Sequence, residues 1–310
     1  MLSCFDFWEN PGLRILNIIG GIFMWMIFAV CSAFFAGVTA VLSKVGIQNV
    51  KSNLGTAIRT IVVFFFAWLM VFVVGAQNGI SDIGSKTLIF LILSGVATGA
   101  SWLCYFRALK YGDVNRVTPI DKSGTILSML FAFLFLHEEI TCFKVICMAL
   151  IGCGTYLMIE KHEVTKQESG RRDWLLWAAL SAVFAALTSV LGKIGISDID
   201  AALGTAIRTF VVLIMAWVVV FATNEQDDIK NITGKSILFL ILSGITTGLS
   251  WLCYYKALQE GPASVVVPLD KLSILVTILF SRIVLKEILS RKSLLGLILL
   301  ALGTLLLLCA

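Results

Sequence analysis

The chain has 310 residues, of which 59% are hydrophobic and only 14% are Asp, Glu, Lys or Arg. An average soluble protein carries about 25% charged residues, so this composition excludes a soluble globular domain. The net charge of +5 comes from scattered basic residues rather than from a basic tract, and no nucleic-acid partner is expected. The composition therefore predicts an all-α integral membrane protein.

Ten apolar segments are each long enough for a bilayer-crossing helix, which needs about 20 mainly apolar residues. In chain order they cover residues 24–47, 53–75, 86–109, 114–136, 142–160, 173–196, 202–223, 236–258, 263–285 and 291–309. Residues 1–23 form an N-terminal extension without the features of a secretory signal. The longest hydrophilic connector, residues 161–172, is a linker loop that is too short for a soluble domain.

An internal repeat divides these ten segments into two units. Four motifs recur at an offset of 149 residues, with no insertion or deletion between them. The matched pairs are Leu54–Thr60 with Leu203–Thr209, Phe90–Gly95 with Phe239–Gly244, Ser101–Tyr105 with Ser250–Tyr254, and Pro119–Lys122 with Pro268–Lys271. The units are therefore residues 24–160 and 173–310, each with five predicted spans.

Five is an odd number, and this has a topological consequence. If each span crosses the membrane once, the second unit begins on the opposite side from the first. The sequence thus predicts ten transmembrane helices arranged as two inverted five-helix repeats. Inverted repeats are typical of proteins that open alternately to each side of a membrane.

The distribution of Lys and Arg predicts the orientation. After repeat-matched pairs and intramembrane lysines are set aside, thirteen basic residues lie on the side of the loops after the odd-numbered spans. Only Arg14, Lys86 and Lys144 lie on the opposite side. The positive-inside rule then places the odd-numbered loops in the cytoplasm and both termini outside it.

Ionisable residues within a span are costly, so they indicate function by default. A Pro-x-Asp-Lys motif occurs in the fourth span of each repeat, as Pro119, Asp121 and Lys122 and again as Pro268, Asp270 and Lys271. Proline removes one helix hydrogen bond, which frees the carbonyl four residues earlier and breaks the helix turn. A broken turn beside charged side chains is typical of a substrate site near the membrane midplane.

Each aspartate has a candidate partner at the same depth. Arg59 and Asp121 both lie about seven residues into spans that enter from the same side, which is about 10 Å at 1.5 Å per residue. Arg208 and Asp270 repeat this arrangement. One interpretation is a purely structural Arg–Asp pair, and the other is a charge that faces a cavity.

The charge balance favours a ligand of one sign. Lys44 and Lys193, near the ends of the first span of each repeat, add to the arginines and intramembrane lysines, and each repeat carries a single opposing aspartate. The resulting positive charge favours an anionic or carboxylate-bearing solute. Lys44 and Lys193 can alternatively extend to the membrane surface.

Aromatic residues follow one face of the third span in each repeat. Helical spacing aligns Thr98, Trp102 and Tyr105, and again Thr247, Trp251 and Tyr254. This face is either the wall of a polar cavity or an interfacial and packing surface. The small residues Gly95, Gly99, Gly244 and Gly248 predict close approach of neighbouring helices.

No cofactor or metal is expected. Most of the eight cysteines lie within apolar runs, and His137 and His162 have no second ligand at suitable spacing. No nucleophile–base combination indicates an enzyme.

With these motifs in place, both units resemble the EamA domain of the drug/metabolite transporter superfamily. The first unit carries Ser101–Leu109 with Tyr111-Gly112, the turn Leu136–Thr141, and Gly152 with Gly154; the second carries Ala257-Leu258, Gly261-Pro262, Pro268, Lys286-Glu287 and Gly296–Gly303. The Pro-x-Asp-Lys motif is similar to the short five-helix bacterial and archaeal members. The chain therefore resembles a tandem of two such members.

The resemblance implies a ten-helix basket around a central cavity lined by spans 1, 3, 4, 6, 8 and 9. It also implies that spans 5 and 10 pack at an interface, which is compatible with a monomer or with a homodimer through these helices. Glu138 and Glu287 match a turn glutamate with a structural role. Spans 1 and 6 lack the acidic residue of the small multidrug-resistance relatives, so Asp121 and Asp270 are the residues left for ion coupling.

Taken together, we expect a secondary transporter in the cytoplasmic membrane, with a small-molecule solute and membrane lipid as partners. Export of amino acids or related carboxylates is the first hypothesis. The alternatives are another solute class, such as a nucleotide sugar, a phosphorylated compound or a cationic drug, and a membrane scaffold that transports nothing.

Overall fold

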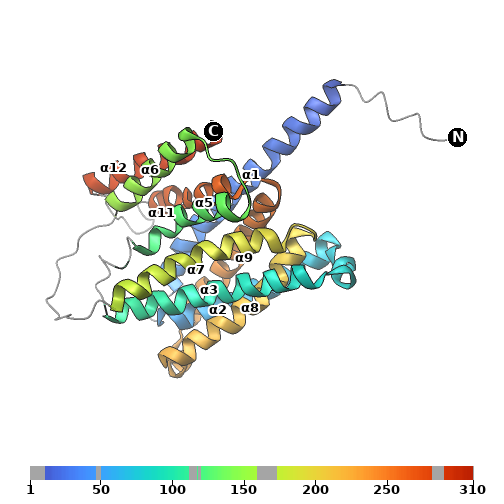
Figure 1. The fold of residues 1–310 in the computed structure, drawn as a ribbon. Coiled ribbons are helices and arrows are strands. Elements are labelled where there is room, and N and C mark those ends of the chain that lie inside the picture. The colour runs from blue at the N-terminus through green and yellow to red at the C-terminus, as the bar shows by residue number, and fades with distance from the viewer. Residues whose placement is uncertain are drawn as a thin grey trace.

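The computed structural model describes residues 11–46, 50–111, 117, 120–158, 173–280 and 290–309, and all regular elements in these ranges are helices (Figure 1). The first repeat contains α1 (Pro11–Gly46), α2 (Ser52–Val74), η1 (Ala76–Asp82), α3 (Ser85–Tyr111), α5 (Gly124–Phe135) and α6 (Cys142–Leu157). The second contains α7 (Asp173–Gly195), α8 (Ala201–Thr223), η2 (Gln226–Asn231), α9 (Gly234–Glu260), α10 (Ala263–Lys271), α11 (Ser273–Phe280), α12 (Arg291–Leu306) and η4 (Leu307–Cys309). The predicted all-α class is confirmed.

Among the described residues, seven segments are long and apolar enough to cross a membrane. They are Met24–Ser43, Ser52–Val74, Ser85–Tyr105, Trp174–Gly195, Ala201–Thr223, Gly234–Glu260 and Ala263–Phe280. The other three predicted spans correspond to α5, α6 and α12, which have 12, 16 and 16 described residues. The predicted fourth span, residues 114–136, also includes residues 114–116 and 118–119, which lie outside the described residues.

Helix α1 begins at Pro11 rather than at the predicted start of the first span, Met24. Proline suits the first position of a helix because its missing N–H would have no partner there. The 36 residues of α1 span about 54 Å at 1.5 Å per residue, which exceeds the bilayer core of about 30 Å. Figure 1 shows its N-terminal part projecting away from the other helices.

The main helix pairings connect one repeat with the other. Helix α1 packs along α9, and its repeat equivalent α7 packs along α3. Helix α2 packs against its own equivalent α8, and α6 packs against its equivalent α12. The two repeats are therefore interlocked, and each builds part of the surroundings of the other.

Small residues allow these pairings to be close. An added Cβ at Gly95 would lie 2.7 Å from Cβ of Val211, and one at Gly244 would lie 2.6 Å from Cβ of Val62. The predicted packing role of these glycines is confirmed. Between α6 and α12, a Cβ at Gly154 would lie 2.5 Å from the backbone nitrogen of Leu300. The helices expected at an interface thus pack within one chain, and the oligomeric state stays a prediction.

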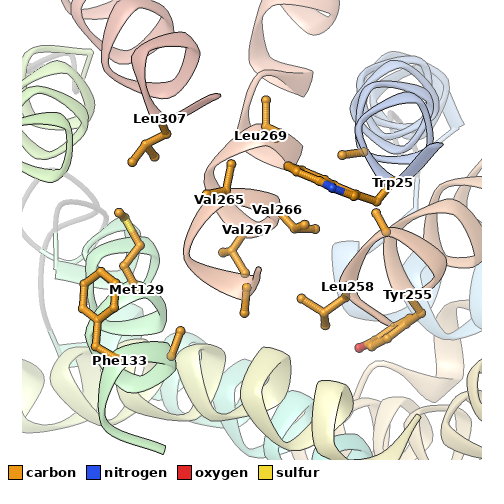
Figure 2. Close-up of a cluster of buried hydrophobic side chains, with 14 of the residues drawn as sticks. Trp25, Met129, Phe133, Tyr255, Leu258, Val265, Val266, Val267, Leu269 and Leu307 are labelled. Carbon is orange, nitrogen blue, oxygen red and sulfur yellow. The ribbon is translucent and has the colours of Figure 1, made fainter. Parts of the chain in front are cut away.

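A cluster of buried apolar side chains surrounds α10. Figure 2 shows Val265–Val267 of α10 between Met129 and Phe133 of α5 on one side and Trp25 and Leu258 on the other. This packing fixes the position of α10, and with it the position of Asp270 and Lys271 at the C-terminal end of the helix. Helix α10 ends at Lys271 and α11 begins at Ser273, so the break in this span directly follows the Asp270-Lys271 pair.

Candidate functional site

A polar cavity of about 300 Å³ lies between the two repeats, and we call it the central cavity. Its walls come from α1, α3, α7, α8, α9 and α10. The lining residues are Ala36, Thr98, Ser101, Trp102, Ala185, Thr188, Ser189, Arg208, Ser250, Trp251, Tyr254, Tyr255, Asp270 and Lys271. The expected spans 1, 3, 6, 8 and 9 are present. Helix α8, the seventh span, is an addition through Arg208, and no described residue of the fourth span lines the cavity.

Asp270 is held at the cavity wall by hydroxyl groups. The Ser32 hydroxyl donates to Asp270 Oδ1 at 2.7 Å, and the Ser250 hydroxyl donates to the backbone carbonyl of Ser32 at 3.1 Å. The same construction recurs 149 residues away, where Ser181 donates to Asp121 Oδ1 at 2.7 Å. Each aspartate is therefore held by a serine from the other repeat.

Arg208 is the most buried charged group of the cavity, with a relative exposure of 2%. Its Nε donates to Ser94 Oγ at 2.9 Å and its Nη2 to Thr98 Oγ1 at 2.6 Å. The guanidinium also lies over the rings of Trp251 and Tyr255, at 5.3 Å and 4.8 Å from their centroids. Its Nη1 is buried and has no hydrogen-bond partner among the residues that the structure describes. The arginine is thus fixed in position, and its Nη1 amino group is unused.

Arg59, the repeat equivalent of Arg208, has different surroundings. It is half-buried, and its Nη1 donates to Ser43 Oγ at 2.7 Å. The predicted pairs of Arg59 with Asp121 and of Arg208 with Asp270 are wrong, because all four side chains have other hydrogen-bond partners. Equal depth in the membrane places two residues at one height, but it does not orient their side chains toward each other.

Two sequence differences between the repeats explain this asymmetry. The position of Ser43 is occupied by Gly192 in the second repeat, which removes the hydroxyl that would hold the arginine. The vacated space is filled by Tyr255, since an added Cβ at Gly192 would lie 2.7 Å from Tyr255 Cε1 and 3.2 Å from Ser94 Oγ. Tyr255 itself corresponds to Phe106 in the first repeat. Arg208 therefore bonds to α3 and lies over an aromatic ring.

The predicted aromatic residues separate into two groups. Trp102, Trp251 and Tyr254 line the central cavity, and the Tyr254 hydroxyl donates to Ser189 Oγ at 2.9 Å. Tyr105 instead packs against the apolar cluster around Ala108. The cavity-wall interpretation therefore holds for three of the four residues.

The predicted lysines also differ in position. Lys271 lines the cavity, with its Nζ 3.7 Å from Asp270 Oδ2, whereas Lys122 is exposed and does not line it. Lys193 Nζ lies 3.4 Å from Glu138 Oε1 and donates to the carbonyl of Gly261 at 2.5 Å. It therefore belongs to a structural contact at one end of the bundle. The Lys44 side chain and Pro119 lie outside the described residues, and Pro268 lies within α10.

Glu138 organises that end of the bundle. Its two carboxylate oxygens accept the backbone N–H groups of Ala263 and Ser264 at 2.6 Å and 2.9 Å, at the start of α10. The expected structural role is confirmed for Glu138, because its charge stabilises a helix N-terminus whose N–H groups have no partners within the helix. Glu287 lies outside the described residues.

Several polar lining residues were not predicted as site residues: Ser101, Thr188, Ser189, Ser250 and Tyr255. A signal was present for one of them. Thr188 on α7 corresponds to Thr39 on α1, and each follows a serine, Ser181 or Ser32, by seven residues. Residues seven apart lie on one helix face, so paired hydroxyls at this spacing indicate a polar stripe.

Comparison with known proteins agrees with this architecture. The model of the EamA-like transporter family matches residues 23–160 and again residues 172–309. The chain belongs to the EamA-like transporter family. The two matches coincide with the two repeats, and the protein is a multi-pass membrane transporter of the drug/metabolite type.

Two individual proteins illustrate the likeness. An "Uncharacterized transporter in cobO 3'region" from Sinorhizobium sp is 45% identical over 134 residues, which are 43% of this chain and 95% of that relative. That relative thus has about the length of one repeat. A solved structure described as "Crystal structure of protein" has a TM-score of 0.73, with 91% of this chain and 96% of that chain covered at 14% identity. At that identity the likeness concerns the fold alone.

Proposed function

We propose that this transporter exports small polar metabolites that carry a carboxylate, with amino acids and related acids as the substrate class. It works as a secondary transporter by alternating access, in the cytoplasmic membrane, with ten spans in two inverted repeats. The central cavity is the binding site. Arg208 receives the carboxylate, and Asp270 is the partner of an ammonium group or a coupling proton.

The unused donor of Arg208 is the observation that carries this proposal. A buried donor without a partner costs about 1–3 kcal/mol, and more when the group is charged. A carboxylate that accepts from Nη1 would remove this cost and would neutralise the guanidinium at the same time. Because Ser94 and Thr98 already hold the other side of the guanidinium, the site is preorganised for an anion.

The remaining charges of the cavity suit a zwitterion. Arg208 and Lys271 bring two positive charges and Asp270 brings one negative charge, which leaves an excess of one positive charge. An anionic group is therefore favoured, while Asp270 offers an acceptor for an ammonium group. The rings of Trp251 and Tyr254 add apolar surface beside these polar groups, as is usual in small-molecule sites.

Contacts at the two ends of the bundle support the inverted arrangement. At one end, Asn53 at the start of the second span donates to Glu225, which follows the seventh span, at 2.7 Å. At the other end, Lys193 of the sixth span contacts Glu138 after the fourth and Gly261 after the eighth. Odd-numbered loops thus meet odd-numbered loops, and even-numbered loops meet even-numbered ones, as inversion requires. Parallel repeats would mix them.

Flux measurements with purified protein in liposomes test this function. Labelled L-alanine, L-threonine and succinate would be loaded inside, and efflux would be compared among wild type, Arg208→Gln and the double variant Asp121→Asn/Asp270→Asn. We expect efflux of at least one amino acid, a loss of about tenfold or more in Arg208→Gln, and loss of efflux in the double variant. Wild-type efflux that both variants retain would contradict the proposal.

A further inference from the structure

A second cavity, of about 140 Å³, lies between α2, α3 and α8, and we call it the side cavity. These three helices lie side by side in Figure 1. The residues that line it are Asn53, Thr56, Arg59, Trp102, Ala216 and Val219. It lies toward the end of the bundle where the second span begins and the seventh ends, which is the end predicted to face the cytoplasm.

The side cavity has an incompletely paired cation. The Arg59 guanidinium has five N–H donors, and within the described part of the chain it makes one hydrogen bond, from Nη1 to Ser43 Oγ. Among the described residues no carboxylate lies within ion-pair distance of Arg59; the four recorded pairs involve Lys51, Lys193, Lys256 and Lys271. With respect to the described residues, most of the donors of Arg59 therefore remain available to an anion.

The same cavity has a buried acceptor without a partner. Asn53 has a relative exposure of 6%, and its Nδ2 donates to Glu225 Oε1 at 2.7 Å and to Thr223 Oγ1 at 3.3 Å. These two bonds determine the orientation of the amide, so the opposite atom, Oδ1, is an acceptor. That oxygen is buried, and no described residue donates a hydrogen bond to it. A ligand with a donor group beside its anionic group would satisfy both Arg59 and Asn53.

This feature is specific to one half of the molecule. The position of Asn53 is occupied by Ala202 in the second repeat, so the acceptor is absent beside Arg208. Glu225, which orients Asn53, corresponds to Ala76 in the first repeat. The polar groups of the side cavity are thus specific to this position and have no equivalent beside Arg208 in the other repeat.

Trp102 connects the two cavities, because its side chain lines both of them. Arg59 lines the side cavity and Arg208 lines the central cavity, so the two arginines belong to cavities that share one residue of their walls. The shared residue makes Trp102 a point at which a solute could pass between the two cationic sites.

We infer that the side cavity is a second, weaker binding site for the same class of solute, an acid with an adjacent amino or hydroxyl group, occupied before the central cavity. This inference rests on the proposed function. Arg59 holds the carboxylate, Asn53 Oδ1 accepts from the amino or hydroxyl group, and Trp102 separates the two sites. The small volume restricts the occupant to a compact solute.

Counting bound ligands tests this inference. Full-length protein in lipid nanodiscs would be equilibrated with radiolabelled L-alanine, and binding isotherms would be compared for wild type, Arg59→Gln and Arg208→Gln. We expect two bound molecules per chain in wild type and one in each variant. Binding at the remaining site would also show that the variant is folded. Asn53→Ala should weaken only the Arg59 site, by about tenfold.

Other results separate the two proposals. One molecule per chain, lost in Arg208→Gln and kept in Arg59→Gln, would overturn the side-cavity site and leave the proposed function intact. One molecule lost only in Arg59→Gln would overturn the assignment of the central cavity as the principal site, and with it the two-site sequence. No binding to any form would overturn the proposed substrate class and therefore both proposals.

Discussion

The Ser32 hydroxyl lies 2.7 Å from Asp270 Oδ1 and donates a hydrogen bond to it from the opposite repeat. Ser181 holds Asp121 in the same way and at the same distance. The two aspartates nevertheless differ in access, because Asp270 lines the central cavity and Asp121 does not. The two aspartates have the same hydrogen bond, but only Asp270 reaches the cavity. Substituting each one separately can therefore distinguish a role in ligand binding from a role in structure.

Asp270→Asn should weaken binding of an amino acid by about tenfold or more, because the carboxylate is an acceptor in the binding cavity. Asp121→Asn, the matched control, should change affinity by no more than about threefold, because Asp121 does not line the central cavity. Equilibrium binding of labelled L-alanine would measure both. Equal losses in the two variants would contradict the assignment of Asp270 as the ligand partner.

Gly192→Ser should impair the Arg208 site. The new Cβ would lie 2.7 Å from Tyr255 Cε1, which forces the ring to move and offers the arginine an alternative acceptor. We expect a destabilisation of about 1–3 kcal/mol, as for other small-to-large changes in packed sites, and a loss of affinity of about tenfold. The matched change Ser43→Gly removes the hydroxyl from the other arginine and should leave the Arg208 site unaffected. Unchanged affinity in Gly192→Ser would show that the vacated space is not required.

Glu138→Ala should destabilise the protein by about 2–4 kcal/mol, because it leaves two helix N–H groups without acceptors and Lys193 without its ion partner. Unfolding by titration of a denaturing detergent into micelles would measure the change. The neighbouring Glu139→Ala removes an exposed carboxylate and serves as the control. If both variants unfold at the same detergent fraction, Glu138 has no special role in stability.

The contact between Lys51 and Asp228 should make stability depend on pH at high pH. Lys51 Nζ lies 3.0 Å from Asp228 Oδ2, and this hydrogen bond and charge raise the pKa of Lys51 above its usual 10.5. A raised pKa in the folded state means that the contribution is complete below 10.5 and is lost as the pH rises through the raised value. Thermal melts of wild type and Lys51→Ala should therefore differ slightly at neutral pH and coincide at strongly alkaline pH. A difference that persists there would exclude the ion pair as its cause.

Much of the site could be predicted from the sequence because the motifs that contain its residues occur in both repeats. Intramembrane charge alone indicated Arg208, Asp270 and Lys271, and the structure brings all three to one cavity. The aromatic spacing on the third span of the second repeat also indicated Trp251 and Tyr254 correctly. These predictions rest on the free-energy cost of burying charge and on helical periodicity, which act within a single helix.

The remaining features depend on which helices are neighbours. The predicted Arg59–Asp121 pair failed because Ser43 and Ser181 are nearer partners, and Ser181 belongs to the other repeat. Nothing in the hydropathy of α1 or α7 indicates that each packs beside the third span of the opposite unit. The start of α1 at Pro11 was missed for a different reason, because apolar length predicts where a helix crosses a membrane and not where it begins.

The exchange of serines between repeats also bears on the history of such a chain. In a polypeptide with only one repeat, the serine could not reach the aspartate of its own chain if the same contacts formed, and a second copy would have to supply it. In an assembly of two identical copies, the equivalent positions that here carry Ser43 and Gly192 would have to be the same residue. Covalent fusion removes that restriction, since each half can then mutate alone. The unequal arginines of this protein are a form of specialisation that an assembly of identical subunits could not encode.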